Sequence, residues 1–132
     1  MSQDEIADWL RSHFSGFDRM MRLETVESGR ATIRYLVGER HLRPGGTVMG
    51  PAIMLLADTA MYAALLGADR AATGAVTSNL NISFLHRPEP RDLIADAEVL
   101  RLGRSLSVGE VRMHSEGQGP IVAHATVTYS HR

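Results

Sequence analysis

Residues 50 to 67, GPAIMLLADTAMYAALLG, form an apolar segment that contains a single charged side chain. The pattern predicts a helix over residues 51–66, with Gly50 as its N-cap, Pro51 at the first helical position and Gly67 as the stop. Such a helix would be about 24 Å long. Almost every side of it is apolar, which is typical of a helix that is buried all round. The rest of the chain must therefore supply a layer that wraps around it.

Shorter elements precede this segment. Ser2 and Glu5 have the spacing of a capping box, and apolar residues then recur at helical intervals, so we predict a short amphipathic helix at the start of the chain. Two alternating stretches, 21–28 and 30–37, flank Gly29 and predict a β-hairpin. The residues that recur at helical intervals are Ile6, Trp9, Leu10, His13 and Phe14.

From residue 75 onward the apolar period changes to two, which predicts four consecutive strands in an antiparallel meander. The order of elements gives one α+β domain over residues 1–132, in which an antiparallel sheet curls around the long helix. One sheet covers only part of such a helix, so we expect a homodimer or a dimer of dimers. The alternating positions are Leu80, Ile82 and Phe84, then Leu93, Ala95, Ala97 and Val99, then Leu106 and Val108, then Ile121, Ala123, Ala125, Val127 and Tyr129.

The composition excludes several functional classes. A net charge of -1 without any basic block provides no electrostatic footprint for nucleic acid or for an anionic membrane surface. The absence of cysteine excludes disulfides and thiolate sites, and the absence of lysine excludes a lysine Schiff base. The acidic N-terminus lacks the features of a signal peptide, and the apolar run is interrupted and too short to span a bilayer, so we expect a cytoplasmic protein.

Asp58 is the charged residue inside the apolar segment. An unpaired carboxylate there would cost several kcal/mol, so it needs hydrogen-bond or charge partners, or a chemical role. Its structural explanation is a bond from an arginine, from Thr59 or Tyr62, or from a neighbouring strand. Its functional explanation is a catalytic base, because the helix N-terminus at Gly50 offers free N–H groups to an oxyanion. The two lie about 12 Å apart in one helix, and a two-fold axis would bring them together.

The stretch GTVMGPAIMLLADTAMYAAL resembles the central helix of hotdog-fold acyl-CoA thioesterases of the phenylacetate-degradation (PaaI-like) type. The later TSNLNISFLHRP resembles the third strand of that family. The resemblance implies a hotdog fold and hydrolysis of an acyl- or aryl-CoA thioester to the free acid and coenzyme A. It further implies that Asp58 is the general base or nucleophile, that the Gly50 N–H polarises the carbonyl, and that Thr77 positions water.

The chain departs from the family pattern beside these residues. Met49 and Pro51 stand where the family has histidine and a second glycine, and Arg43 stands where a polar amide residue is common. Met49 cannot donate a side-chain hydrogen bond, and Pro51 removes one N–H from the helix start. A hotdog protein that binds acyl-CoA without hydrolysing it is therefore the alternative. A different α+β fold with a buried acid, such as an isomerase or dehydratase, fits less well, since those folds gather several helices before the sheet.

Other candidates concern the substrate and cofactors. Arg43, Met49 and Arg87 are assigned to substrate binding; Arg87 lies in HRPEPRD, where guanidinium groups suit the phosphates of coenzyme A, although such a turn is usually only solvated. No pair of histidines has metal-ligand spacing, and no glycine motif carries a P-loop lysine. We therefore expect no metal and no cofactor.

Overall fold

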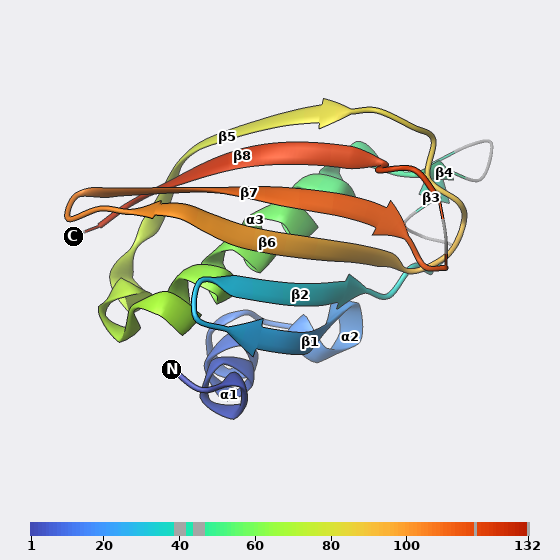
Figure 1. Cartoon of the computed structure of the whole chain (residues 1–132). Coiled ribbons are helices and arrows are strands. Elements are labelled where there is room, and N and C mark those ends of the chain that lie inside the picture. The colour runs from blue at the N-terminus through green and yellow to red at the C-terminus, as the bar shows by residue number, and fades with distance from the viewer. Residues whose placement is uncertain (39–41, 44–46, 118, 132) are drawn as a thin grey trace.

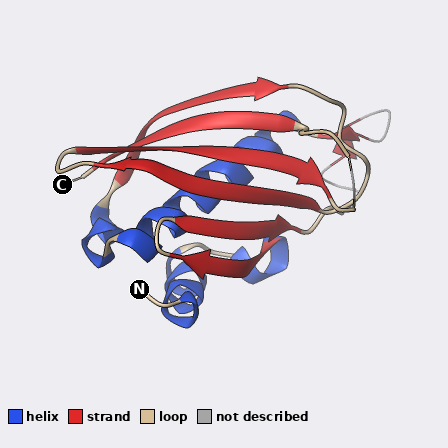
Figure 2. Ribbon diagram, viewed as in Figure 1, coloured by secondary structure: helices blue, strands red, loops and turns tan. Residues whose placement is uncertain are grey.

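The computed structural model describes residues 1–132 except 39–41, 44–46, 118 and 132. A six-stranded antiparallel sheet in the order β1-β2-β6-β7-β8-β5 curves along one side of a long helix, α3 (Figures 1 and 2). The helices are α1 (Gln3–His13), α2 (Phe17–Met20), α3 (Gly50–Ala68) and the 3₁₀ helix η2 (Arg70–Gly74). The strands are β1 (Met21–Glu27), β2 (Arg30–Tyr35), β3 (Leu42–Arg43), β4 (Thr47–Val48), β5 (Val76–Phe84), β6 (Leu93–Leu102), β7 (Leu106–Ser115) and β8 (Ala123–Ser130).

Helix α3 lies where the sequence predicts it, but its ends differ from the prediction. Met49 is the N-cap, Gly50 is the first helical residue, and the helix continues through Gly67 to Ala68. Gly67 has another purpose, because a Cβ there would lie 2.8 Å from Val26 Cγ1 and 2.9 Å from the backbone oxygen of Glu27. The glycine therefore lets strand β1 approach the helix closely, and it does not end the helix.

Most of α3 is buried inside the fold, but one side stays open. Twelve of its nineteen residues are buried, whereas Met54 and Leu55 are 43% and 41% exposed and Asp58 is half-buried. With nineteen residues and a mean hydropathy of 1.5, α3 is long and apolar enough to cross a membrane, contrary to the prediction from length. Its burial inside the fold identifies it as a core helix. The open side is the part that the sequence assigns to a second subunit.

The predicted meander of four strands is confirmed only for β6, β7 and β8. Strand β5 pairs with β8 along Val76↔Ser130 to Phe84↔Ala123 and forms one edge of the sheet, and it does not neighbour β6. Alternation of apolar residues decides which face of a sheet a side chain takes, but it does not decide which strands pair. The result matters for the site, because Thr77 on β5 and Tyr129 on β8 both bond to Asp58 on α3.

The residues of β7 that face the helix are not the apolar pair Leu106 and Val108 that the alternating pattern predicts. Leu106 is 50% exposed, and Ser107, Gly109 and Val111 face the core. Space explains this choice, since a Cβ on Gly109 would lie 2.4 Å from Met61 Sδ and 2.5 Å from the backbone oxygen of Glu98. A glycine is needed where β7 passes over α3.

Gly109→Ala is expected to destabilise the fold by about 1–3 kcal/mol through overpacking, because the backbone of Glu98 cannot move away as a flexible side chain can. Thermal unfolding should show a melting temperature lower by roughly 5 °C or more. Gly74→Ala is the matched control: a Cβ at Gly74 meets nothing within 4 Å, so its melting temperature should stay at or slightly above wild type. Equal melting temperatures for the two variants would contradict this account of Gly109.

Helix α1 packs against the edge strand β1 and against α3. Its predicted capping box between Ser2 and Glu5 is present, Ile6 and Leu10 enter the core, and Arg70 lies 2.8 Å from Glu5. The hydrogen bond from the Ser2 N–H, together with Arg70, lowers the pKa of Glu5 to about 2. These contacts fix the C-terminal half of α1, including Trp9, beside α3.

Candidate active site

Asp58 is held by two hydroxyl groups. Its Oδ1 accepts a hydrogen bond of 2.7 Å from Thr77 Oγ1 and one of 2.8 Å from the Tyr129 hydroxyl. Its other oxygen, Oδ2, accepts no hydrogen bond from the residues that the structure describes. Among the partners that the sequence allows for Asp58, residues on the neighbouring strands donate these hydrogen bonds. Thr59 and Tyr62 bond elsewhere, to the carbonyl oxygens of Leu55 and Thr73.

The pairing of β5 with β8 produces this arrangement. Thr77 and Tyr129 are directly opposite one another in the ladder, and the register shifts immediately after Thr77. The structure therefore brings Asp58 and Thr77, two of the residues predicted for the site, within hydrogen-bond distance. Sequence reasoning missed Tyr129, which it treated only as an alternating apolar position. Tyr129 could have been recognised only from its position opposite Thr77 in the pairing of β5 with β8. The predicted meander does not contain that pairing.

A cleft of about 390 Å³ opens beside Asp58. Its walls come from α1, α3, β5 and β8, and three aromatic side chains, Trp9, Phe14 and Tyr62, line it together with Tyr129. Trp9 Nε1 donates to the Tyr62 hydroxyl at 3.0 Å, and the Tyr62 ring packs edge-on against Phe14 with centroids 5.8 Å apart. The N-terminal helix thus forms one wall of the cleft, which its apolar pattern alone did not indicate.

The titratable side chains that line the cleft are one carboxylate, one imidazole and two phenols, namely Asp58, His13, Tyr62 and Tyr129. Burial, followed by the nearby charge of Asp58, raises the pKa of Tyr129 far above its ordinary value, and burial also raises the pKa of Tyr62. Both phenols are therefore neutral donors at physiological pH. The described residues that line the cleft include no arginine, and the hydrogen bonds to the Asp58 carboxylate come from hydroxyl groups.

Gly50, Met49 and Arg87, which the sequence also predicts for the site, lie apart from this cleft. Gly50 begins α3, and eight residues of helix place it about 12 Å from Asp58. Met49 is the exposed N-cap of α3 and makes no side-chain cap bond. Arg43 lies in β3 opposite Thr47, and Arg87 is exposed between β5 and β6. Neither Gly50, Met49 nor Arg87 lines the cleft of its own chain.

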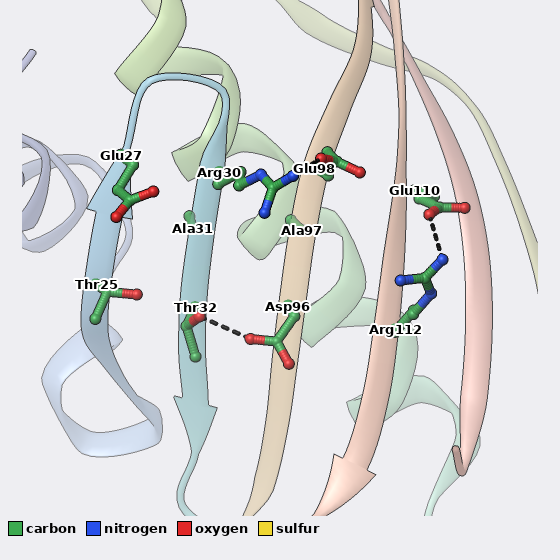
Figure 3. Close-up of a pocket in the computed structure, with 10 residues that line it drawn as sticks. All are labelled: Thr25, Glu27, Arg30, Ala31, Thr32, Asp96, Ala97, Glu98, Glu110 and Arg112. Atoms are coloured by element: carbon green, nitrogen blue, oxygen red, sulfur yellow. Dashed lines mark hydrogen bonds and ion pairs between the residues drawn. The ribbon is translucent and has the colours of Figure 1, made fainter.

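A second hollow lies on the outer face of the sheet (Figure 3). Both of its arginines pair with carboxylates: Arg30 lies 2.5 Å from Glu98, and Arg112 lies 2.9 Å from Glu110. The Thr32 hydroxyl donates to Asp96 at 2.7 Å, as Figure 3 also shows. The lining thus carries four carboxylates and two guanidinium groups on a solvated sheet face. Among the described residues, no three histidine, aspartate or glutamate side chains cluster so as to hold a metal ion.

The fold and the sequence together define the class of protein. Residues 45–122 match the family model of the thioesterase superfamily. A solved protein of Silicibacter sp. TM1040, provisionally named a thioesterase, is 40% identical, with a TM-score of 0.90 over 98% of this chain and 91% of that chain. The chain belongs to the thioesterase superfamily and has its hotdog fold, as the resemblance implies.

Two further relatives lie at lower identity. Human acyl-coenzyme A thioesterase 13 is 28% identical over 116 residues, which is 85% of this chain and 82% of the relative. The Escherichia coli PaaI protein from the phenylacetic acid degradation operon is 20% identical, with a TM-score of 0.86 over 98% of this chain and 93% of that chain. The PaaI protein is thus among the structural neighbours, and its likeness to this chain supports the predicted hotdog fold.

Proposed function

We propose that this protein hydrolyses an acyl- or aryl-CoA thioester to the free acid and coenzyme A, with Asp58 as general base or nucleophile. Family membership and the likeness to acyl-coenzyme A thioesterase 13 support thioester hydrolysis in general. The observation that carries the proposal is the state of the Asp58 carboxylate: Oδ1 is occupied by two hydroxyl donors, and Oδ2 has no described partner beside an open cleft.

The proposed chemistry needs a carboxylate that acts as base or nucleophile, and a hydrogen-bond donor that stabilises the oxyanion. As a base, Oδ2 removes a proton from water while the water oxygen attacks the thioester carbonyl carbon, and the C–S bond then breaks to release the thiolate of coenzyme A. As a nucleophile, Oδ2 attacks the carbonyl carbon, the C–S bond breaks to release the thiolate of coenzyme A, and water then hydrolyses the resulting mixed anhydride. The Thr77 hydroxyl donates a hydrogen bond to Asp58, and its oxygen lone pairs remain able to accept one from the attacking water.

We further propose that the backbone N–H of Gly50 in a second subunit donates the hydrogen bond that stabilises the oxyanion. The first N–H groups of a helix have no intrahelical acceptor, and the Gly50 N–H of the same chain lies too far from Asp58. Exposed apolar side chains, Met54 and Leu55 on α3 with Val76 and Phe84 on β5, lie at the open side of the helix and at the sheet edge. A homodimer, alone or within a dimer of dimers, would cover them and pair the unpaired edge of β5.

The proposed substrate contacts follow from the same arrangement. Met49 and Arg87 do not line the Asp58 cleft of their own chain, so they would contact coenzyme A or the acyl group from the partner subunit. Arg43 is proposed as a further contact from β3. The alternative of an acyl-CoA-binding protein without hydrolysis is favoured by Met49 and Pro51 at the start of α3, where two groups of the family's site are missing.

Release of free thiol from a panel of acyl- and aryl-CoA substrates tests the proposal, and the cysteine-free chain adds no thiol background. We expect turnover with at least one substrate, and the best substrate will identify the acyl group. A rise in melting temperature with acyl-CoA but no thiol release from any substrate would contradict hydrolysis and favour the binding protein.

A further inference from the structure

We infer that Tyr129 is the positioning residue for Asp58, which fixes the carboxylate through Oδ1 so that Oδ2 remains available for the reaction. This inference rests on the proposed function for its kinetic consequence. Its structural content, the bond between a buried phenol and the cleft carboxylate, stands on the described contacts alone.

The Tyr129 hydroxyl meets Asp58 at two atoms. It lies 2.8 Å from Oδ1 and 3.0 Å from the backbone oxygen of the same residue. Two acceptors on one residue restrict both the side chain and the backbone position of that turn of α3. Thr77 approaches Oδ1 as well, at 2.7 Å, but it comes from the exposed edge strand β5. Tyr129 is therefore the donor whose own position is fixed by the core.

The ring of Tyr129 is held firmly. Its exposure is 4%, and it stacks on Tyr62 with centroids 5.7 Å apart and an interplanar angle of 18°. Tyr62 is in turn held by Trp9 Nε1 and by the carbonyl oxygen of Thr73, at 3.0 Å and 2.7 Å. The packed core thus fixes the Tyr129 phenol, and the phenol in turn holds in place a carboxylate that is itself only half-buried.

The bond depends on a protonated phenol, and burial keeps the Tyr129 hydroxyl protonated. The other titratable groups that line the cleft beside Asp58 are His13 on α1 and Tyr62 on α3. Loss of the Tyr129 hydroxyl therefore leaves Thr77 as the described side-chain donor to the carboxylate, and Oδ1 loses the donor that the core holds in place.

Tyr129→Phe tests this. We expect kcat at neutral pH to fall about tenfold or more while KM stays nearly unchanged, since the carboxylate loses its fixed orientation and the cleft keeps its shape. Tyr35→Phe is the matched control, because it removes the hydroxyl of a buried tyrosine on β2 that does not line the cleft, and its kcat should stay at the wild-type value.

An unchanged kcat, or a loss confined to KM, in a folded Tyr129→Phe would overturn the inference and leave Tyr129 a structural residue. Should the variant not fold, 3-fluorotyrosine at position 129 takes its place, since it keeps the ring and donates a stronger hydrogen bond. Its kcat should then change while KM does not, and an unchanged kcat would again overturn the inference. If wild type turns over no thioester, the proposed function fails alone. The NMR chemical shift of the Asp58 carboxyl carbon then tests the bond without catalysis: it should differ from wild type in Tyr129→Phe but not in Tyr35→Phe.

Discussion

Asp58→Asn is expected to lose on the order of a hundredfold or more in kcat, with the fold intact. The asparagine oxygen can accept the hydrogen bonds that Thr77 Oγ1 and the Tyr129 hydroxyl now donate to Oδ1, so the local packing has no reason to change. The amide nitrogen would replace Oδ2, and a neutral amide neither removes a proton from water nor attacks a thioester. Thiol release under saturating substrate measures the loss.

Asp69→Asn provides the matched control for that variant. Asp69 lies at the other end of α3 and caps η2 by accepting a hydrogen bond of 2.9 Å from the Ala71 N–H, a role that asparagine also fills. Both variants should melt within a few degrees of wild type, and only Asp58→Asn should lose activity. Full turnover by a folded Asp58→Asn would remove the carboxylate from the mechanism and return it to a structural role.

Much of the fold could be predicted because α3 leaves few alternatives. A helix that is apolar on nearly every side needs a surrounding layer, and the period-two segments on both sides of it in the sequence can only supply a sheet. The same reasoning identified Asp58, because a lone carboxylate in such a helix requires donors. The resemblance added Thr77, which the structure places 2.7 Å from Asp58.

The remainder depended on information that periodicity does not contain. Gly67 was predicted to end the helix because glycine often does so, but it serves the close approach of β1 at Val26. The placement of β5 beside β8 depends on how the chain leaves α3, and local residue patterns do not record it. Since Tyr129 reaches Asp58 only through that pairing, the second hydroxyl donor could not be found before the strand order was known.

Gly50→Pro is expected to lower kcat by about 10²–10³, the typical cost of removing one oxyanion donor. Proline suits the first helical position and removes only the N–H group there. Gly50→Ala is its control, since a Cβ at this position would lie at an ordinary 3.6 Å from the Phe84 ring, and the N–H is kept. The activity of Gly50→Ala should stay within a few-fold of wild type, because this variant keeps the N–H group that stabilises the oxyanion. Equal losses in the two variants would instead assign the effect to the side chain and contradict an oxyanion role.

The substitutions Asp58→Asn and Gly50→Pro together can decide whether the site is shared between subunits. In a dimer formed from one Asp58→Asn chain and one Gly50→Pro chain, a shared arrangement leaves one site with both groups intact and gives the other site both lesions. Co-expression with two different affinity tags isolates this mixed dimer, which should regain about half of the wild-type activity although each parent is nearly inactive. If Asp58 and Gly50 acted within one chain, both sites of the mixed dimer would carry a lesion. A mixed dimer as inactive as its parents would therefore contradict the shared site, whatever the substrate.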